Sequence, residues 1–239
     1  MAGLNAKKIQ GTAKGPQQEA LEAGTYPCRV VEIIDLGVQP QRAFEGQPKP
    51  PVQHVRITYE FTDEFCVDAG GNEQEDKPRW LSEDIPFHPL SSELAKSTKR
   101  YKAIDPKDNF DGDFTQLVNC PCNVTITATE GKGKNADKVY NNIAAVNTMR
   151  QRDADKCAEL VNEPKVFLVG DPDKAVWAKL PQWLQEKITG AVDFQGSALD
   201  KALNGGGTAK PKLEPRPAYD EDIEEDAAEG AAAGEDKPW

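Results

Sequence analysis

Hydrophobic and polar positions alternate along much of residues 21–150, and this period of two predicts strands rather than helices. We expect five strands, at residues 24–38, 52–65, 79–87, 120–129 and 138–146, the last two forming a hairpin. The first is rich in β-branched residues and is expected to be largely buried. The second predicts a half-buried strand, with Val55, Ile57, Tyr59 and Phe61 on one face and His54, Arg56, Thr58 and Glu60 on the other.

The period becomes helical in two places. Ser91–Ala103 begins with a serine N-cap signal and predicts a short helix between strands three and four. Residues 173–188 have apolar side chains at helical spacing despite Pro181, and we expect Trp177 and Trp183 in the core. Three strands, a helix and two strands follow one another as in a five-stranded OB-fold barrel, so we predict a mainly β OB fold with a short C-terminal helical element. SH3-like barrels and split sandwiches have similar strand counts and remain alternatives.

Charge and composition divide the chain of 239 residues, which has 29 Lys and Arg against 40 Asp and Glu and a net charge of -11. Residues 218–239 contain nine acids and one base, a net charge of -8, so the preceding residues carry only -3. We predict a flexible arm at 1–20, the OB domain at 21–150, a helical extension packed on the barrel at 151–194, and a flexible linker with a disordered acidic tail at 195–239. A tail that only confers solubility is the alternative.

Several functional classes lack their sequence signals. No apolar run is long enough for a membrane span, and the N-terminus does not resemble a secretory signal, so we expect a cytoplasmic protein. Five scattered cysteines predict free thiols. His54 and His88 have no neighbouring nucleophile motif, the turn 131–134 lacks the spacing of a phosphate loop, and Cys120 and Cys122 lack a second pair of metal ligands. We therefore expect no enzyme, no catalytic residue, no cofactor and no metal.

The remaining candidate function is binding. Residues 91–152 have ten bases and seven acids, and aromatic side chains lie among these and other cations on the predicted outer faces. Unpaired bases stack on flat rings while Lys and Arg neutralise phosphates, so this combination favours single-stranded nucleic acid. The predicted DNA-binding residues are Arg42, Phe44, His54, Arg56, Trp80, Lys99, Arg100, Tyr101, Lys102, Lys132, Lys134, Lys138 and Tyr140. The alternative is that Trp80 and Tyr140 only pack beneath a loop or the C-terminal helix, and that Tyr101 is buried.

The chain resembles the single-stranded DNA-binding proteins of tailed bacteriophages, in which an OB domain precedes an acidic tail that ends in an aromatic residue. The resemblance rests on the predicted strand order, on residues 21–42, 77–83, 96–101 and 121–126, and on the terminal Lys-Pro-Trp. It implies a tail that competes with DNA and recruits the DNA polymerase and the helicase-primase, and it implies a homodimer. The implied partner-docking residues are Asp220, Glu221, Asp222, Glu224, Glu225, Asp226 and Trp239. The body departs from this pattern, because it is only weakly basic in residues 91–152 and has a net charge of -3 over residues 1–217.

We therefore predict a non-enzymatic protein that coats single-stranded DNA without strong sequence preference during phage DNA replication, recombination or repair, in the host cytoplasm. The first alternative is a protein-interaction or chaperone-like module whose acidic tail binds a basic partner. The second is a nuclease or accessory hydrolase, which the missing catalytic motifs disfavour.

Overall fold

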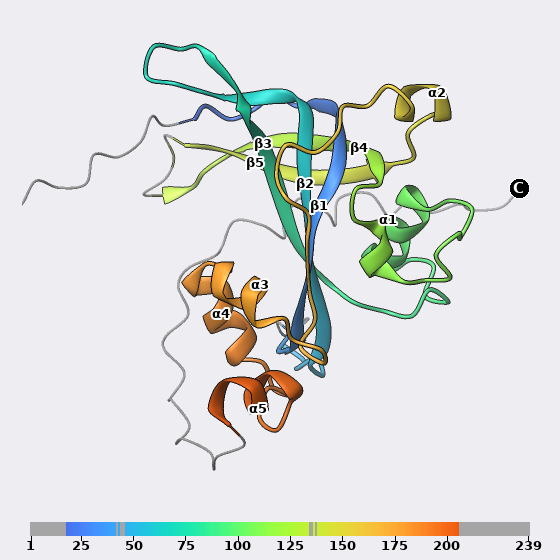
Figure 1. Ribbon diagram of the computed structural model, residues 1–239, viewed down its shortest axis with the longest axis vertical. Coiled ribbons are helices and arrows are strands. Elements are labelled where there is room, and N and C mark those ends of the chain that lie inside the picture. Colours follow the sequence, from blue (N-terminus) through green and yellow to red (C-terminus); the bar gives the residue numbers. More distant parts are fainter. Residues whose placement is uncertain (1–17, 42, 44–45, 134–135, 137, 206–239) are drawn as a thin grey trace, which may run out of the picture.

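Strand β1 (Gly24–Gln39) is the central element of a mainly β structure (Figure 1). The computed structural model describes residues 18–41, 43, 46–133, 136 and 138–205. The other strands are β2 (Val52–Val67), β3 (Glu73–Pro86), β4 (Pro121–Glu130), β5 (Val139–Asn147) and β6 (Lys165–Phe167). The helices are α1 (Lys96–Ile104), the short 3-10 helix η2 (Phe114–Leu117), α2 (Gln151–Ala154), α3 (Lys174–Lys179), α4 (Gln182–Thr189) and α5 (Ala198–Asn204). The five predicted strands and the helix between strands three and four are confirmed.

The strands form one sheet in the order β3-β2-β1-β4-β5, with every neighbouring pair antiparallel. The sheet curls until β3 and β5 contact each other. No backbone ladder joins these two end strands within the described residues, so the sheet is open and the predicted five-stranded OB barrel is not confirmed.

A sixth strand joins the sheet because β1 is longer than its partner β4. The β1–β4 ladder ends at the pair Arg29 and Pro121, and Val30 still bonds to the backbone of Asn119 and Cys120, after which β4 no longer reaches this edge of β1. Strand β6 occupies this edge in parallel, opposite residues 32–34. Covering an otherwise bare strand edge prevents it from pairing with other chains.

Hydrophobic cores form on both faces of β1. The main core contains Val30, Ile57 and Tyr59 together with Tyr101 and Ile104 of α1. The second core combines Ile34 and Leu36 of β1 with side chains of β6 and the C-terminal helices, including Phe167, Leu184, Ile188 and Leu199. Figure 1 shows these helices gathered beside the far end of β1 and β2, with α1 on the other side of the sheet.

Strand β2 is buried on both faces at its centre, so the prediction of a half-buried strand is wrong. Thr58 and Glu60 lie on its outer face and are both about as buried as Tyr59 on the inner one. The chain after α2 crosses this face, where the Glu60 carboxylate accepts hydrogen bonds from the backbone of Val161 and Asn162 and from the Asn162 amide. Sequence periodicity cannot show that a distant segment covers a polar face.

The helical predictions need three corrections. Helix α1 begins at Lys96 rather than Ser91. Its N-cap residue is Ala95, so Ser91 does not cap the helix and no side chain makes a capping hydrogen bond. The predicted helix at 173–188 is two helices, since Pro181 lacks the N–H needed to continue α3 and Leu180 is extended. Helix α5 lies where the flexible linker was predicted to start at residue 195, and it adds Leu199 to the second core. The acidic tail lies outside the described residues.

Candidate functional site

Trp80 occupies the outer face of β3, as predicted. It pairs with Glu60 on β2, and both side chains lie on the face opposite to Tyr59 and Leu81. Its side chain is 51% exposed, so a large flat surface is available to a ligand. Strand β3 is an end strand of the sheet, so Trp80 borders an open edge, while residues 161 and 162 cover the neighbouring Glu60 on β2.

The second predicted ring, Tyr140, lies on β5 and is half-buried. It pairs with Thr129 on the outer face of β4. Across the sheet, the strand pairing leads from Trp80 through Glu60 and Arg29 to Pro121 on β4. Pro121 is eight residues from Thr129, the partner of Tyr140, so the two rings lie in different rows of the sheet. Within the described residues, the rings of Trp80 and Tyr140 do not stack on each other. The exposed Lys132 and Lys138 flank the β4–β5 turn beside Tyr140, whereas Lys134, Arg42 and Phe44 lie outside the described residues.

Arg100 and Tyr101 are buried, so their predicted place on a DNA-binding surface is wrong. Tyr101 is 1% exposed, and its hydroxyl donates to the carboxylates of Asp105 and Asp108 and accepts from the Gly112 N–H. Burial raises the pKa of Tyr101 to about 12. The lysine-rich sequence around both residues suggested a surface, but α1 turns this side toward the main core.

The buried Arg100 guanidinium binds Glu83 of β3 through two nitrogens, at 2.7 and 3.1 Å. Lys96 adds a third contact to the same carboxylate, and the Tyr59 hydroxyl donates a fourth. Burial by itself would raise the pKa of Glu83, but the hydrogen bonds and charge of Arg100 and Lys96 outweigh burial and lower it. This network attaches α1 to the sheet and is structural.

Lys99 and Lys102 are exposed on α1, as expected for cations of a binding surface. Lys102 lies 3.6 Å from Glu93 in an exposed ion pair. Helix α1 packs against the face of the sheet that carries the main core, whereas Trp80 is on the opposite face. The structure therefore does not assemble these two lysines with Trp80 on one face.

Arg56 takes part in an interaction that the sequence did not reveal. Its guanidinium binds Asp84 at 2.6 Å and lies over the ring of Trp183, 4.8 Å from the centroid. Lys187 reaches the other oxygen of Asp84 at 2.7 Å. Trp183 is 50% exposed, so its predicted core position is wrong, while Trp177 packs against Phe167 in the second core as predicted. The apolar neighbours of Trp183 gave no sign of this difference.

His54 lies next to this group and is half-buried. Its Nδ1 atom is buried and has no hydrogen-bond partner among the described residues. Burial and the nearby Lys187 ammonium lower the pKa of His54. His54 is therefore neutral near physiological pH and contributes no charge to attract phosphate.

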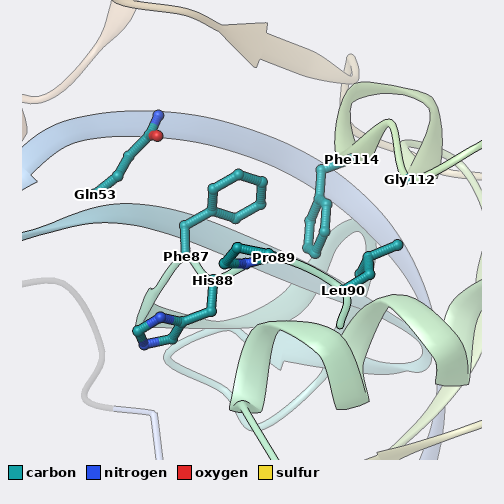
Figure 2. Close-up of a pocket in the computed structure, with 7 residues that line it drawn as sticks. All are labelled: Gln53, Phe87, His88, Pro89, Leu90, Gly112 and Phe114. Carbon is teal, nitrogen blue, oxygen red and sulfur yellow. The ribbon is translucent and has the colours of Figure 1, made fainter. Parts of the chain in front are cut away.

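A cavity of about 360 Å³ lies at the connection between β3 and α1. Figure 2 shows the rings of Phe87 and Phe114 directed toward each other, with the His88 ring turned away from them. A second cavity of about 380 Å³ on the other side of His88 is lined partly by Leu94 and Lys96. Neither cavity is lined by a predicted DNA-binding residue. Their walls offer an apolar side chain or a ring more contacts than they offer a phosphate.

Cysteines and metal-ligating side chains were the remaining candidates for chemistry in the described part of the chain. All five cysteines are free thiols, and burial raises the pKa of Cys28 and Cys122, which disfavours their nucleophilic thiolate forms. No three His, Cys, Asp or Glu side chains within the described residues lie together as a metal site. None of the described helices is long and apolar enough to cross a lipid bilayer.

Comparison with known proteins gives no relative from which a function can be transferred: no family model, no curated protein and no solved structure matches this chain.

Proposed function

We propose that this chain binds single-stranded DNA without strong sequence preference, as a phage protein of DNA replication, recombination or repair. The observation that carries the proposal is the half-exposed Trp80 on the outer face of β3. OB folds bind oligonucleotides on the face of their second and third strands. The strand neighbours β3-β2-β1-β4-β5 and the contact between β3 and β5 support an OB-like arrangement with Trp80 on that face.

Most of the negative charge lies in the tail, so the body itself is nearly neutral and can approach a polyanion such as DNA. The body carries a net charge of only -3, while the tail of residues 218–239 carries -8. A stacking contact is tolerant of base identity, and lysines that neutralise phosphates add affinity that decreases with salt.

The proposal includes a tail that recruits replication proteins such as the DNA polymerase and helicase-primase, a homodimer, a non-enzymatic role and a cytoplasmic location.

A titration with an oligo-dT of about 12 nucleotides, followed by tryptophan fluorescence, tests the proposal. We expect quenching that salt reverses. Binding releases cations from the DNA, and the favourable free energy of this release becomes smaller as the salt concentration rises. Trp80→Ala is expected to weaken binding by about 1–3 kcal/mol, since it removes one base-stacking ring. Leu94→Ala is the matched control, because Leu94 is also a large exposed hydrophobic residue but lies at the second cavity. The absence of any fluorescence or anisotropy change at low salt would reject DNA binding.

A protein-interaction module is the second candidate, and the open, mostly apolar cavity beside the contacting rings of Phe87 and Phe114 favours it. A module of this kind would bind a peptide with an apolar side chain in the cavity and would not respond to oligo-dT. The same titration therefore separates the two functions.

A further inference from the structure

Trp183 is half-exposed although its neighbours on α4 belong to a core. Leu184 and Ile188 are four residues apart on one side of the helix and are buried in the second core. Trp183 lies outside this buried stripe, and the Arg56 guanidinium covers its ring at 4.8 Å. A cation over an indole ring is held by the negative face of the π-system. The ring is therefore fixed on one side, while half of the side chain is accessible.

Two cations, Arg56 and Lys187, lie close to this ring, and Glu186, three residues after Trp183, adds a carboxylate to the same face of α4. Lys187 is four residues after Trp183, so the two side chains share a face of α4. Arg56 and Lys187 both bind Asp84, at 2.6 and 2.7 Å. Lys187 is also partly exposed. A flat, half-exposed ring can stack on an unpaired base while the partly exposed Lys187 contacts its phosphate, which an apolar protein segment does not require.

Trp183 and Trp80 border the same outer face of β3. Asp84, which holds Arg56 and Lys187, is four residues from Trp80 on this strand, so Trp80 and Asp84 are about 13 Å apart along β3 at a rise of about 3.3 Å per residue. A single DNA strand with the rise that it has in a duplex, about 3.4 Å per nucleotide, spans this distance in about four nucleotides. About four nucleotides is within the number of nucleotides that one OB-type domain binds.

We propose that Trp183 is a second base-stacking site for single-stranded DNA, aligned with Trp80 along the outer face of β3. The inference rests on the proposed function and extends it, because it adds a residue from the C-terminal helices to the binding face. Arg56 is a positioning residue in this arrangement: it holds the indole ring from behind instead of reading the DNA.

Trp183→Ala in the full chain tests the proposal, with the oligo-dT of about 12 nucleotides as the probe. We expect binding to weaken between about fivefold and about 150-fold, as for the loss of one stacked base. The slope of affinity against salt is expected to stay the same, because no phosphate contact is lost. Val192→Ala, at another exposed apolar residue close to α4, is the control and should bind as wild type.

Trp183→Phe keeps a ring on α4 and gives a second readout. If Trp183 stacks on a base, the DNA-induced fluorescence change should be smaller in Trp183→Phe than in wild type, because one quenched emitter is missing. An unchanged fluorescence amplitude, or a wild-type isotherm for Trp183→Ala, would overturn the proposal and leave this surface to a protein partner.

Failure of this inference can be distinguished from failure of the proposed function. If wild type does not bind oligo-dT, both are wrong. If Trp80→Ala weakens binding while Trp183→Ala does not, the proposed function stands and only the second stacking site is wrong. Should Trp183→Ala fail to fold, the fluorescence amplitude of Trp183→Phe decides.

Discussion

At the scale of single residues, the Glu83 carboxylate holds helix α1 onto the sheet. It is buried, yet it accepts hydrogen bonds from Arg100, Lys96 and Tyr59. Removing one partner of a buried ion pair leaves the other charge without compensation, which costs more than the pair itself contributes. Glu83 and Arg100 are therefore expected to be far more sensitive to substitution than the exposed lysines of α1.

Glu83→Gln is expected to lower the free energy of unfolding by about 3–5 kcal/mol at neutral pH, because Arg100 remains buried without its counter-charge. The folded protein lowers the pKa of Glu83 below its ordinary value of 4.5, so this contribution is complete above that pH and is lost as the pH falls through the folded pKa. Chemical denaturation at several pH values should show the difference from wild type decreasing in acid. Glu93→Gln, in the exposed pair with Lys102, should change stability by less than about 1 kcal/mol. Equal effects of the two variants would contradict the assigned role of Glu83.

At the scale of elements, the C-terminal helices are part of the folded unit because they bury the second face of β1. Ile34 and Leu36 pack against Leu184 and Ile188 across this layer. Gly37 makes the approach possible: its φ is +71°, and an added Cβ would lie 2.8 Å from the Cβ of Ala191. The helical layer is therefore fitted to the backbone of β1 as well as to its side chains.

Ile188→Ala should destabilise the protein by about 2–5 kcal/mol, because Ile188 is completely buried and its removal leaves a cavity. Thermal unfolding by circular dichroism measures this loss. Val192→Ala, at a 62% exposed position close to the same helix, is the control and should have almost no effect. Similar stabilities for both variants would show that the helical layer does not contribute to the folded state.

At the scale of the whole molecule, the charge is strongly separated between body and tail. Residues 218–239 account for -8 of the net -11. A tethered polyanion has a high effective concentration near cations of the same chain, and a longer polyanion such as DNA can displace it. The tail is thereby expected to reduce the apparent affinity for DNA.

Deletion of residues 218–239 should tighten binding of oligo-dT at low salt, and the difference from wild type should vanish at high salt because the competition is electrostatic. Fluorescence titrations at two salt concentrations measure this. Replacing Asp220, Glu221, Asp222, Glu224, Glu225 and Asp226 by their amides keeps the length and should have a smaller effect in the same direction. Weaker or unchanged binding after deletion would exclude competition. The deletion should also abolish capture of the replication proteins.

The sequence predicted local structure better than it predicted which surfaces are covered. The alternation in β2 correctly placed Ile57 and Tyr59 in the core, since strand period depends on neighbouring residues. It could not show that residues about 100 positions later bury Glu60. The wrong prediction for Trp183 has the same cause. Helical spacing showed that the segment has a buried face, but the position of Arg56 over the indole ring depends on the tertiary arrangement. Of the candidate site, the alternation placed Trp80, Arg56 and Tyr140 on outer faces, but it could not show what covers them.

The two-sided burial of β1 also has a consequence for motion. Its amides pair with β2 on one edge and with β4 and β6 on the other, and both cores close over its side chains. Amide protons of such a strand exchange with solvent only when the entire domain opens, whereas strand ends and hairpin turns open separately. Native-state hydrogen exchange should therefore find the slowest deuterium uptake at residues 30–36, with protection equal to the global stability. Faster uptake there than in the β4–β5 hairpin would mean that the two layers separate before the molecule unfolds.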